Sequence, residues 1–153
     1  MKVKDLMTPD AGCTLADEPL TKAADIMWQR DCGVVPVVDA EMAVIGMITD
    51  RDICRVLTSR NKKASEIRAG EAAAGSVVGC RPGDSVTGVL KKMKKNHLRR
   101  LPVLDGDKKL VGIISIRDII FASEKKKTLR KKAYSTLLRL AKPSAIVLHE
   151  ISE

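Results

Sequence analysis

At 153 residues, with 44% hydrophobic and 31% charged residues, the chain has the composition of one globular domain and not of a disordered segment. Its formal net charge is +9, and the basic excess is concentrated between Phe121 and Glu153, where eight Lys and Arg stand against three Glu. Aromatic residues make up only 2%, which leaves almost no side chains on which nucleic-acid bases could stack.

The cysteines are scattered without CxxC spacing, so they indicate neither a zinc site nor a disulfide framework. They are typical of reduced thiols in a cytosolic protein: Cys13, Cys32, Cys54 and Cys80. The first residues contain no apolar signal segment, and no run approaches the ~18 apolar residues of a membrane span. We therefore expect a cytoplasmic protein with no metal site.

The sequence repeats itself at an offset of 66 residues. Ten identities occur without a gap when positions 21–53 are compared with the positions 66 residues later. They include Pro36 with Pro102 and Asp52 with Asp118. So many matches in one register indicate a tandem duplication.

Each half carries the same order of signals. The i, i+3, i+4, i+7 spacing of one helix face occurs twice, at Leu20, Ala23, Ala24 and Met27 and again at Val86, Val89, Leu90 and Met93. Two short apolar strands follow, at 34–38 and 44–48 in the first half and at 101–104 and 110–114 in the second. A further helix opens at residues 49 and 115, and a short strand is expected before the first helix of each half.

Neither half is long enough to cover both faces of its own sheet. The sequence therefore predicts an α/β (α+β) fold in which two repeats, each a small sheet with flanking helices, share one core. We expect repeat 1 over residues 1–62, repeat 2 over residues 63–123, and a basic amphipathic tail over residues 124–153.

Five segments carry a resemblance to a known family. They are "VKDLMT" (3–8), "GVVPVVD" (33–39), "VIGMITDRDI" (44–53), "RRLPVLD" (99–105) and "LVGIISIRDI" (110–119). In this order and at matched spacing they resemble the cystathionine-beta-synthase (CBS) domain, which occurs in tandem pairs called Bateman modules. The resemblance implies a stand-alone regulatory module that binds AMP, ADP, ATP or S-adenosylmethionine between the repeats. It also implies a homodimer, no catalytic residues and no catalytic cofactor.

A Thr/Ser-x-x-Asp motif lies at the turn from the second strand to the second helix of each half, where the family holds ribose and phosphate. Here the motif is Thr49 with Asp52 and Ser115 with Asp118. A carboxylate can accept hydrogen bonds from a cis-diol, and a hydroxyl at a helix start suits a phosphate. The same spacing is also that of a capping box, in which the side chains satisfy backbone N–H groups. Both interpretations fit these residues.

The resemblance favours the second-half cleft as the nucleotide site. In a nucleotide-binding member of the family a basic residue just before the "LPV" strand reaches the phosphate, and the matching residue is Arg100, with Arg117 in reach of the same place. Arg99, beside it, is expected at the surface. The candidates in this cleft are Asp118, Ser115, Arg100, Arg117, Pro102, Met7, Thr8, Gly12 and Thr14, with the N-terminal segment passing over the base.

The first-half cleft has Gly33 and Val34 where the second half has Arg99 and Arg100, and Asp31 is close by. We expect this cleft to be weaker, empty or filled by a less anionic ligand. Its candidates are Asp52, Thr49, Arg51, Val34, Pro36 and Val78.

The segment before the second repeat departs from the family pattern. Residues 64–68 stand where the family has V-x-D-I-M, and a run of small residues, 69–76, follows. On this alignment the linker is five residues longer than its counterpart before the first repeat, which changes the expected geometry of the first-half cleft.

After residue 120 the resemblance ends. Apolar residues at helical spacing and interleaved basic residues predict an amphipathic helix that stops before Pro143. This tail can pack on the module or on a second copy, or it can bind a partner protein. It can also contact nucleic acid or an anionic membrane, but only the run of basic residues supports these two alternatives.

Two functions remain open from the sequence. The first is a sensor of an adenine nucleotide or a related adenosyl ligand that signals to a partner. The alternative is an interaction or scaffold protein with degenerate clefts that acts through its basic tail on a protein or nucleic acid. No spacing typical of a catalytic or metal site supports an enzyme.

Overall fold

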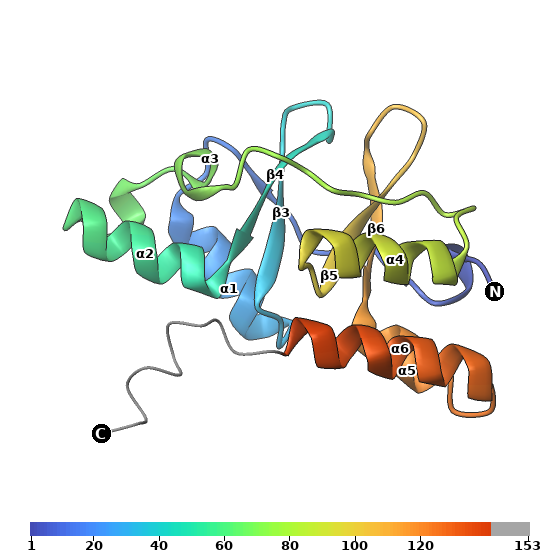
Figure 1. Cartoon of the computed structure of the whole chain (residues 1–153). Coiled ribbons are helices and arrows are strands. Elements are labelled where there is room, and N and C mark those ends of the chain that lie inside the picture. Colours follow the sequence, from blue (N-terminus) through green and yellow to red (C-terminus); the bar gives the residue numbers. More distant parts are fainter. Residues whose placement is uncertain (142–153) are drawn as a thin grey trace, which may run out of the picture. The chain divides into compact units, whose positions relative to one another are not determined.

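The computed structural model describes residues 1–141, in which helices alternate with short strands in an α+β arrangement (Figure 1). Up to residue 60 the elements are the 3-10 helix η1 (Val3–Asp5), β1 (Thr8–Pro9), β2 (Thr14–Leu15), α1 (Leu20–Gln29), β3 (Val34–Val38), β4 (Val44–Thr49) and α2 (Asp50–Arg60). From residue 64 they are η2 (Ala64–Glu66), α3 (Ala69–Ala72), α4 (Val86–Asn96), β5 (Arg100–Leu104), β6 (Leu110–Ser115), α5 (Ile116–Ala122) and α6 (Lys127–Leu140).

The strands and helices predicted from periodicity are confirmed. Both predicted helix faces point inward, since Leu20 and Ala23 on α1 and Val89 and Met93 on α4 are at most 1% exposed. All five residues of β3 are buried. The short strand expected before the first helix is present as β2, and in the second half it shrinks to a single bridge between Cys80 and Val103.

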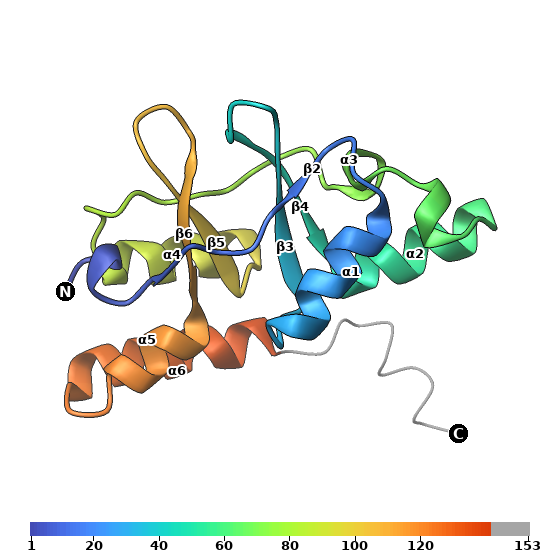
Figure 2. The ribbon, with the colours of Figure 1, turned by 180° about the vertical axis from the view of Figure 1, so that it is seen from behind.

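The strands form two sheets of three. One has the order β2-β3-β4, and the other has the order β1-β6-β5. In the first sheet β3 and β4 are antiparallel, with Val35 opposite Ile48, while β2 runs parallel to β3 (Figure 2). In the second, β1 pairs antiparallel with β6, with Thr8 opposite Ile113.

The chain divides into two compact units, each of which contains residues from both halves. Unit 1 comprises residues 1–7, 82–101 and 114–141 of the described chain, and unit 2 comprises residues 8–81 and 102–113. The boundary therefore runs through β5 and β6 and not between the two repeats.

Leading segments are exchanged between the halves. In unit 2 the Leu20 N–H, at the start of α1, donates to the Ile67 carbonyl at 2.8 Å. In unit 1 the Val86 N–H, at the start of α4, donates to the Met1 carbonyl at 3.3 Å. In each half, the first N–H of the first helix thus donates to a carbonyl of the segment that leads into the other half.

These pairings obey the 66-residue offset and correct the predicted linker. The bridge of Lys2 with Ser85 matches that of Pro19 with Arg68, and the pairing of Thr8 with Ile113 matches that of Ala74 with Met47. Residues 69–73 are therefore the counterpart of 3–7, and α3 is the counterpart of η1. The expectation of a linker five residues longer was wrong, because residues 64–68 had been aligned with a segment to which they are not equivalent.

The core of unit 2 is aliphatic and includes the exchanged segment. It consists of Leu20, Ala23, Ile26, Met27, Val35, Val37, Ile48, Val56, Ile67, Ala69 and Ala72. The hairpin tips of the two halves also meet in this unit, where the Val44 N–H donates to the Lys108 carbonyl at 3.1 Å and the Leu110 N–H to the Met42 carbonyl at 3.2 Å.

Unit 1 contains the predicted amphipathic tail as α6, which packs against α4 and α5. Ala133 is fully buried and Thr136 is 4% exposed, so this face of α6 is covered. The tail was predicted over residues 124–153, of which 142–153 lie outside the described residues.

We predict that Ile67→Ala lowers the free energy of unfolding by about 2–5 kcal/mol, because the side chain is 1% exposed and truncation leaves a cavity in the core of unit 2. The matched control is Ile45→Ala on β4, where the isoleucine is 43% exposed and the expected change is below about 1 kcal/mol. Urea unfolding followed by far-ultraviolet circular dichroism measures both. Equal losses would contradict the structural role of the exchanged segment.

Candidate functional site

Both Thr/Ser-x-x-Asp motifs form complete capping boxes. In unit 1 the Asp118 Oδ2 accepts hydrogen bonds from the Ser115 N–H at 2.7 Å and the Ser115 hydroxyl at 2.8 Å, at the start of α5. In unit 2 the Asp52 Oδ2 accepts from the Thr49 N–H at 2.9 Å and the Thr49 hydroxyl at 2.7 Å, at the start of α2. The structural interpretation of the motif is thus realised twice, and each box fixes the rotamer of its aspartate.

The two aspartates differ in what surrounds their other oxygen. The Asp52 Oδ1 lies 3.9 Å from the Arg55 guanidinium, in an ion pair one turn along α2. The position equivalent to Arg55 is Phe121, and within residues 1–141 the structure gives the Asp118 Oδ1 neither a hydrogen bond nor an ion pair. Asp118 therefore has a carboxylate oxygen that can still accept a hydrogen bond.

The predicted basic residues of the second half, Arg100 and Arg117, belong to unit 1, as do Ser115 and Asp118. Arg100 opens β5 and is half-buried, whereas Arg117 lies in the first turn of α5 and is exposed. Within the described chain neither guanidinium takes part in an ion pair. Their charges are thus uncompensated by the protein, as a site for a phosphate requires.

Arg99 is exposed as predicted and has a partner of its own. Its guanidinium donates to the Leu140 carbonyl at 3.4 Å, at the carboxyl end of α6. This contact places a positive charge where a helix dipole is negative and satisfies one of the last carbonyls of the tail helix. Sequence reasoning missed it, because nothing in the local pattern links residue 99 to residue 140.

The other second-half candidates are divided between the units. Met7 belongs to unit 1, while Pro102 on β5 and the segment that carries Thr8, Gly12 and Thr14 belong to unit 2. Thr8 pairs with β6 and is exposed. A Cβ on Gly12 would lie 2.8 Å from both Arg30 Nε and Ile26 Cγ2, so glycine is needed where this segment crosses α1.

Thr14 is 1% exposed, and its hydroxyl donates to the Glu18 carboxylate at 2.9 Å. The hydroxyl proton is therefore used within the protein. The Leu15 N–H also donates to this carboxylate, at 2.8 Å, and the two hydrogen bonds lower the pKa of Glu18, the backbone bond contributing most.

In the first half Thr49, Asp52, Arg51, Val34, Pro36 and Val78 all belong to unit 2. The run of small residues before the second repeat lies along β4, where the Ala74 N–H donates to the Met47 carbonyl at 3.0 Å. A Cβ on Gly46 would lie 2.7 Å from the Ala73 Cβ, so small residues are required on both sides of this approach. The first-half candidates are therefore flanked by tightly packed backbone.

An acidic hollow occupies the place where the second half has its arginines. It has a volume of about 420 Å³ and is lined by Met27, Trp28, Asp31, Cys32, Gly33 and Asp50. The lining contains two carboxylates and no basic residue, and the Asp50 Oδ2 lies 3.0 Å from the position of a Cβ on Gly33. Asp50 was missed as a site residue, although its place beside Thr49 in the motif was the available signal.

No metal centre emerges from residues 1–141, where no three His, Cys, Asp or Glu side chains are grouped so that they could hold an ion. Burial, helped by Glu18, raises the pKa of the Cys13 thiol, so at neutral pH it is held in its protonated form. In this part of the chain no helix combines the length and apolarity that a bilayer crossing requires.

Comparison with known proteins assigns both repeats. The family model of the CBS domain matches residues 3–59 and 69–125 and ends before α6. CBS domain-containing protein YhcV of Bacillus subtilis is 31% identical over 121 residues, which cover 76% of this chain and 81% of that protein. Hypoxic response protein 1 of Mycobacterium tuberculosis is 32% identical over 116 residues, which cover 76% and 80%.

Solved structures agree with these matches. The crystal structure of Hypoxic Response Protein I with two coordinated zinc ions superposes with a TM-score of 0.73 at 30% identity, covering 79% of this chain and 98% of that one. The CBS domain pair of protein MJ0100, in complex with 5′-methylthioadenosine and S-adenosyl-L-methionine, gives a TM-score of 0.71 at 26% identity, covering 82% and 98%.

We predict that Asp118→Ala and Asp52→Ala each lower the free energy of unfolding by about 1 kcal/mol, because each variant leaves a helix N-cap without its reciprocal hydrogen bond. Asp118→Asn and Asp52→Asn retain an oxygen acceptor at the same place and should lose less. Urea unfolding measures all four variants. If the asparagine variants lost as much as the alanine variants, the negative charge and not the capping hydrogen bond would be the stabilising feature.

Proposed function

Because the chain belongs to the CBS domain family and carries two such domains in tandem, we propose that it is a regulatory module that binds an adenosine-containing ligand and has no enzyme activity of its own. The ligand is an adenine nucleotide (AMP, ADP or ATP) or S-adenosylmethionine. It acts as a regulatory ligand and not as a catalytic cofactor. The protein works in the cytoplasm. One observation carries the proposal. In unit 1 the guanidinium groups of Arg100 and Arg117 have no ion-pair partner within the described chain, and the Asp118 Oδ1 accepts no hydrogen bond there.

Each of these groups has a part to play. The Asp118 carboxylate, held by its capping box, accepts hydrogen bonds from the ribose diol through Oδ1. The Ser115–Asp118 turn and the two guanidinium groups hold the phosphate. Because arginine forms paired hydrogen bonds with phosphate, loss of one such contact weakens binding about tenfold or more.

The charge difference between the halves supports the second half as the nucleotide site. Asp31 and Asp50 repel a phosphate at the corresponding place in the first half, and the spare oxygen of Asp52 is already paired with Arg55. A less anionic adenosyl ligand suits that half better. The complex of the MJ0100 pair with 5′-methylthioadenosine and S-adenosyl-L-methionine supports adenosyl ligands as the class.

Regulation follows from a shift between conformations. A ligand that prefers one arrangement of the repeats raises its population, and a partner protein that recognises that arrangement receives the signal. The alternative, a scaffold with degenerate clefts that acts through its basic tail, is disfavoured because α6 is packed against α4 and α5.

We predict that calorimetric titration with AMP, ADP, ATP and S-adenosylmethionine finds at least one ligand that binds below millimolar concentration. Asp118→Asn and Arg100→Gln should weaken that binding tenfold or more, since the first removes the charge that binds the diol while keeping the cap, and the second removes a phosphate contact.

The matched variants for this test are Asp52→Asn and Arg51→Gln in the first half, at the positions equivalent to Asp118 and Arg117, which should change affinity for a nucleotide less than threefold. Failure of all four compounds to bind would overturn the sensor proposal and leave the scaffold. Equal effects of the two aspartate variants would instead overturn the assignment to the second half.

We also propose that the module is a homodimer that pairs through helical faces. The three aromatic residues all lie outside the core: Trp28 on α1 is 89% exposed, Phe121 on α5 is 75% exposed and Tyr134 on α6 is 50% exposed. A second copy that covers Trp28 and Phe121 gains the hydrophobic free energy that the monomer leaves unused.

We predict that the protein sediments as a dimer and that Trp28→Glu or Phe121→Glu shifts it to monomer, because a charge at a covered apolar position is costly to desolvate. Ile45→Glu, at an isoleucine that is 43% exposed on β4, is the control and should leave the dimer intact. Sedimentation velocity distinguishes the outcomes, and a wild-type monomer would refute the proposal.

A further inference from the structure

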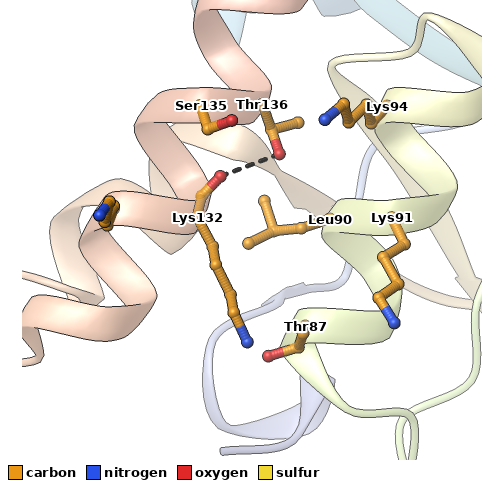
Figure 3. Close-up of a pocket in the computed structure, with 8 residues that line it drawn as sticks. Thr87, Leu90, Lys91, Lys94, Lys132, Ser135 and Thr136 are labelled. Carbon is orange, nitrogen blue, oxygen red and sulfur yellow. Dashed lines mark hydrogen bonds between the residues drawn. The ribbon is translucent and has the colours of Figure 1, made fainter.

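A lysine-lined pocket lies between α4 and the tail helix α6 in unit 1 (Figure 3). It has a volume of about 350 Å³. Its lining residues are Thr87, Leu90, Lys91, Lys94, Lys131, Lys132, Ser135 and Thr136. None of them belongs to the nucleotide site proposed above, so this pocket needs an explanation of its own.

The charge of the lining has one sign. Four of the eight residues are lysines and none is acidic. Asp84, two residues before α4, forms an ion pair with Lys92 at 4.0 Å, and neither residue is part of the lining. An adjoining hollow shares Thr87 and Lys132 and adds Lys126, so the basic character continues along the groove.

Polar and apolar groups complete the pocket. Leu90 is 2% exposed and forms an apolar floor, while Thr87 and Ser135 bring hydroxyl groups from the two helices. The Thr136 hydroxyl donates to the Lys132 carbonyl at 3.0 Å, which leaves its oxygen lone pairs and not its proton for other contacts. In Figure 3 the ammonium groups of Lys91 and Lys132 extend toward the end of the pocket where Thr87 lies, and Lys94 points toward Thr136.

Lysines of α4 and α6 that share a pocket repel one another, and this repulsion opposes the packing of the tail. A multivalent anion in the pocket would convert the repulsion into attraction, since each ammonium group donates charge-assisted hydrogen bonds to phosphate oxygens. Hydroxyl groups at the rim supply further donors. The pocket thus has the chemistry of a phosphate site that joins two helices.

We propose that this pocket binds a compact polyphosphate anion, such as a linear triphosphate, and that the bound anion fixes α6 on α4. The volume fits a small ligand, and the lining contains no aromatic residue on which a nucleic-acid base could stack. The proposal concerns a second site and holds whether or not the nucleotide site of the preceding subsection exists.

The experiment uses the full chain and inorganic tripolyphosphate at constant ionic strength, with binding measured by calorimetry. Lys94→Gln/Lys132→Gln, which removes one ammonium group from each wall, should weaken binding at least tenfold. Lys62→Gln/Lys63→Gln removes the same charge from exposed positions after α2 and should change binding less than twofold. Equal losses in the two variants, or no wild-type binding below millimolar concentration, would overturn the proposal.

Two further arms locate the site and its ligand. Arg100→Gln removes a phosphate contact of the nucleotide site and lies outside the lysine pocket, so it should weaken tripolyphosphate binding less than twofold. A loss as large as that of Lys94→Gln/Lys132→Gln would place the anion at the nucleotide site and refute the pocket. A 20-nucleotide single-stranded DNA, titrated in the same way, should bind more weakly than tripolyphosphate at equal phosphate concentration. If the DNA bound more tightly, the groove would be a nucleic-acid surface and the proposal would be wrong.

Discussion

The fold depends on backbone hydrogen bonds in which each repeat provides the carbonyl acceptor for the first helix of the other repeat. The first N–H groups of a helix have no partner within the helix, and here Leu20 finds the carbonyl of Ile67 while Val86 finds that of Met1. Each helix start is therefore completed by the segment that leads into the other half. Burial of Ile67 and Val3 accompanies this exchange, so neither repeat contains all of its own core. The interleaving explains why the compact units cut across the duplication.

On this symmetric scaffold the two halves carry different charges. The repeated residues set the backbone: the turn aspartates Asp39 and Asp105 each accept two N–H groups, and both Thr/Ser-x-x-Asp motifs cap a helix. The residues that differ set the chemistry, since arginines in one half replace glycine and valine in the other. After the duplication, the residues that shape the backbone have thus stayed the same in both halves, while the residues proposed to bind ligand have diverged.

Local pattern was enough to predict the helices and strands, because burial periodicity and the Thr/Ser-x-x-Asp spacing are properties of adjacent residues. The 66-residue offset places residues 69–73 opposite residues 3–7, but the side chains conceal this equivalence, since alanines stand where the first half has larger residues. Those alanines are explained by the close approach of Ala73 to Gly46, a contact between distant parts of the chain. The bond from Arg99 to Leu140 and the lysine pocket likewise need α6 to be placed on α4 before they can be recognised.

The exposure of Trp28 has a spectroscopic consequence. The chain has one tryptophan, and at 89% exposure its indole is already solvated in the folded protein. In the monomer its emission maximum therefore lies near that of the unfolded chain, so unfolding of the monomer changes it little. The same fluorophore instead reports on whatever covers α1, because transfer of the indole from water to an apolar contact shifts its emission to shorter wavelength. The emission wavelength of Trp28 therefore measures association at α1, and it distinguishes the dimer from both the folded and the unfolded monomer.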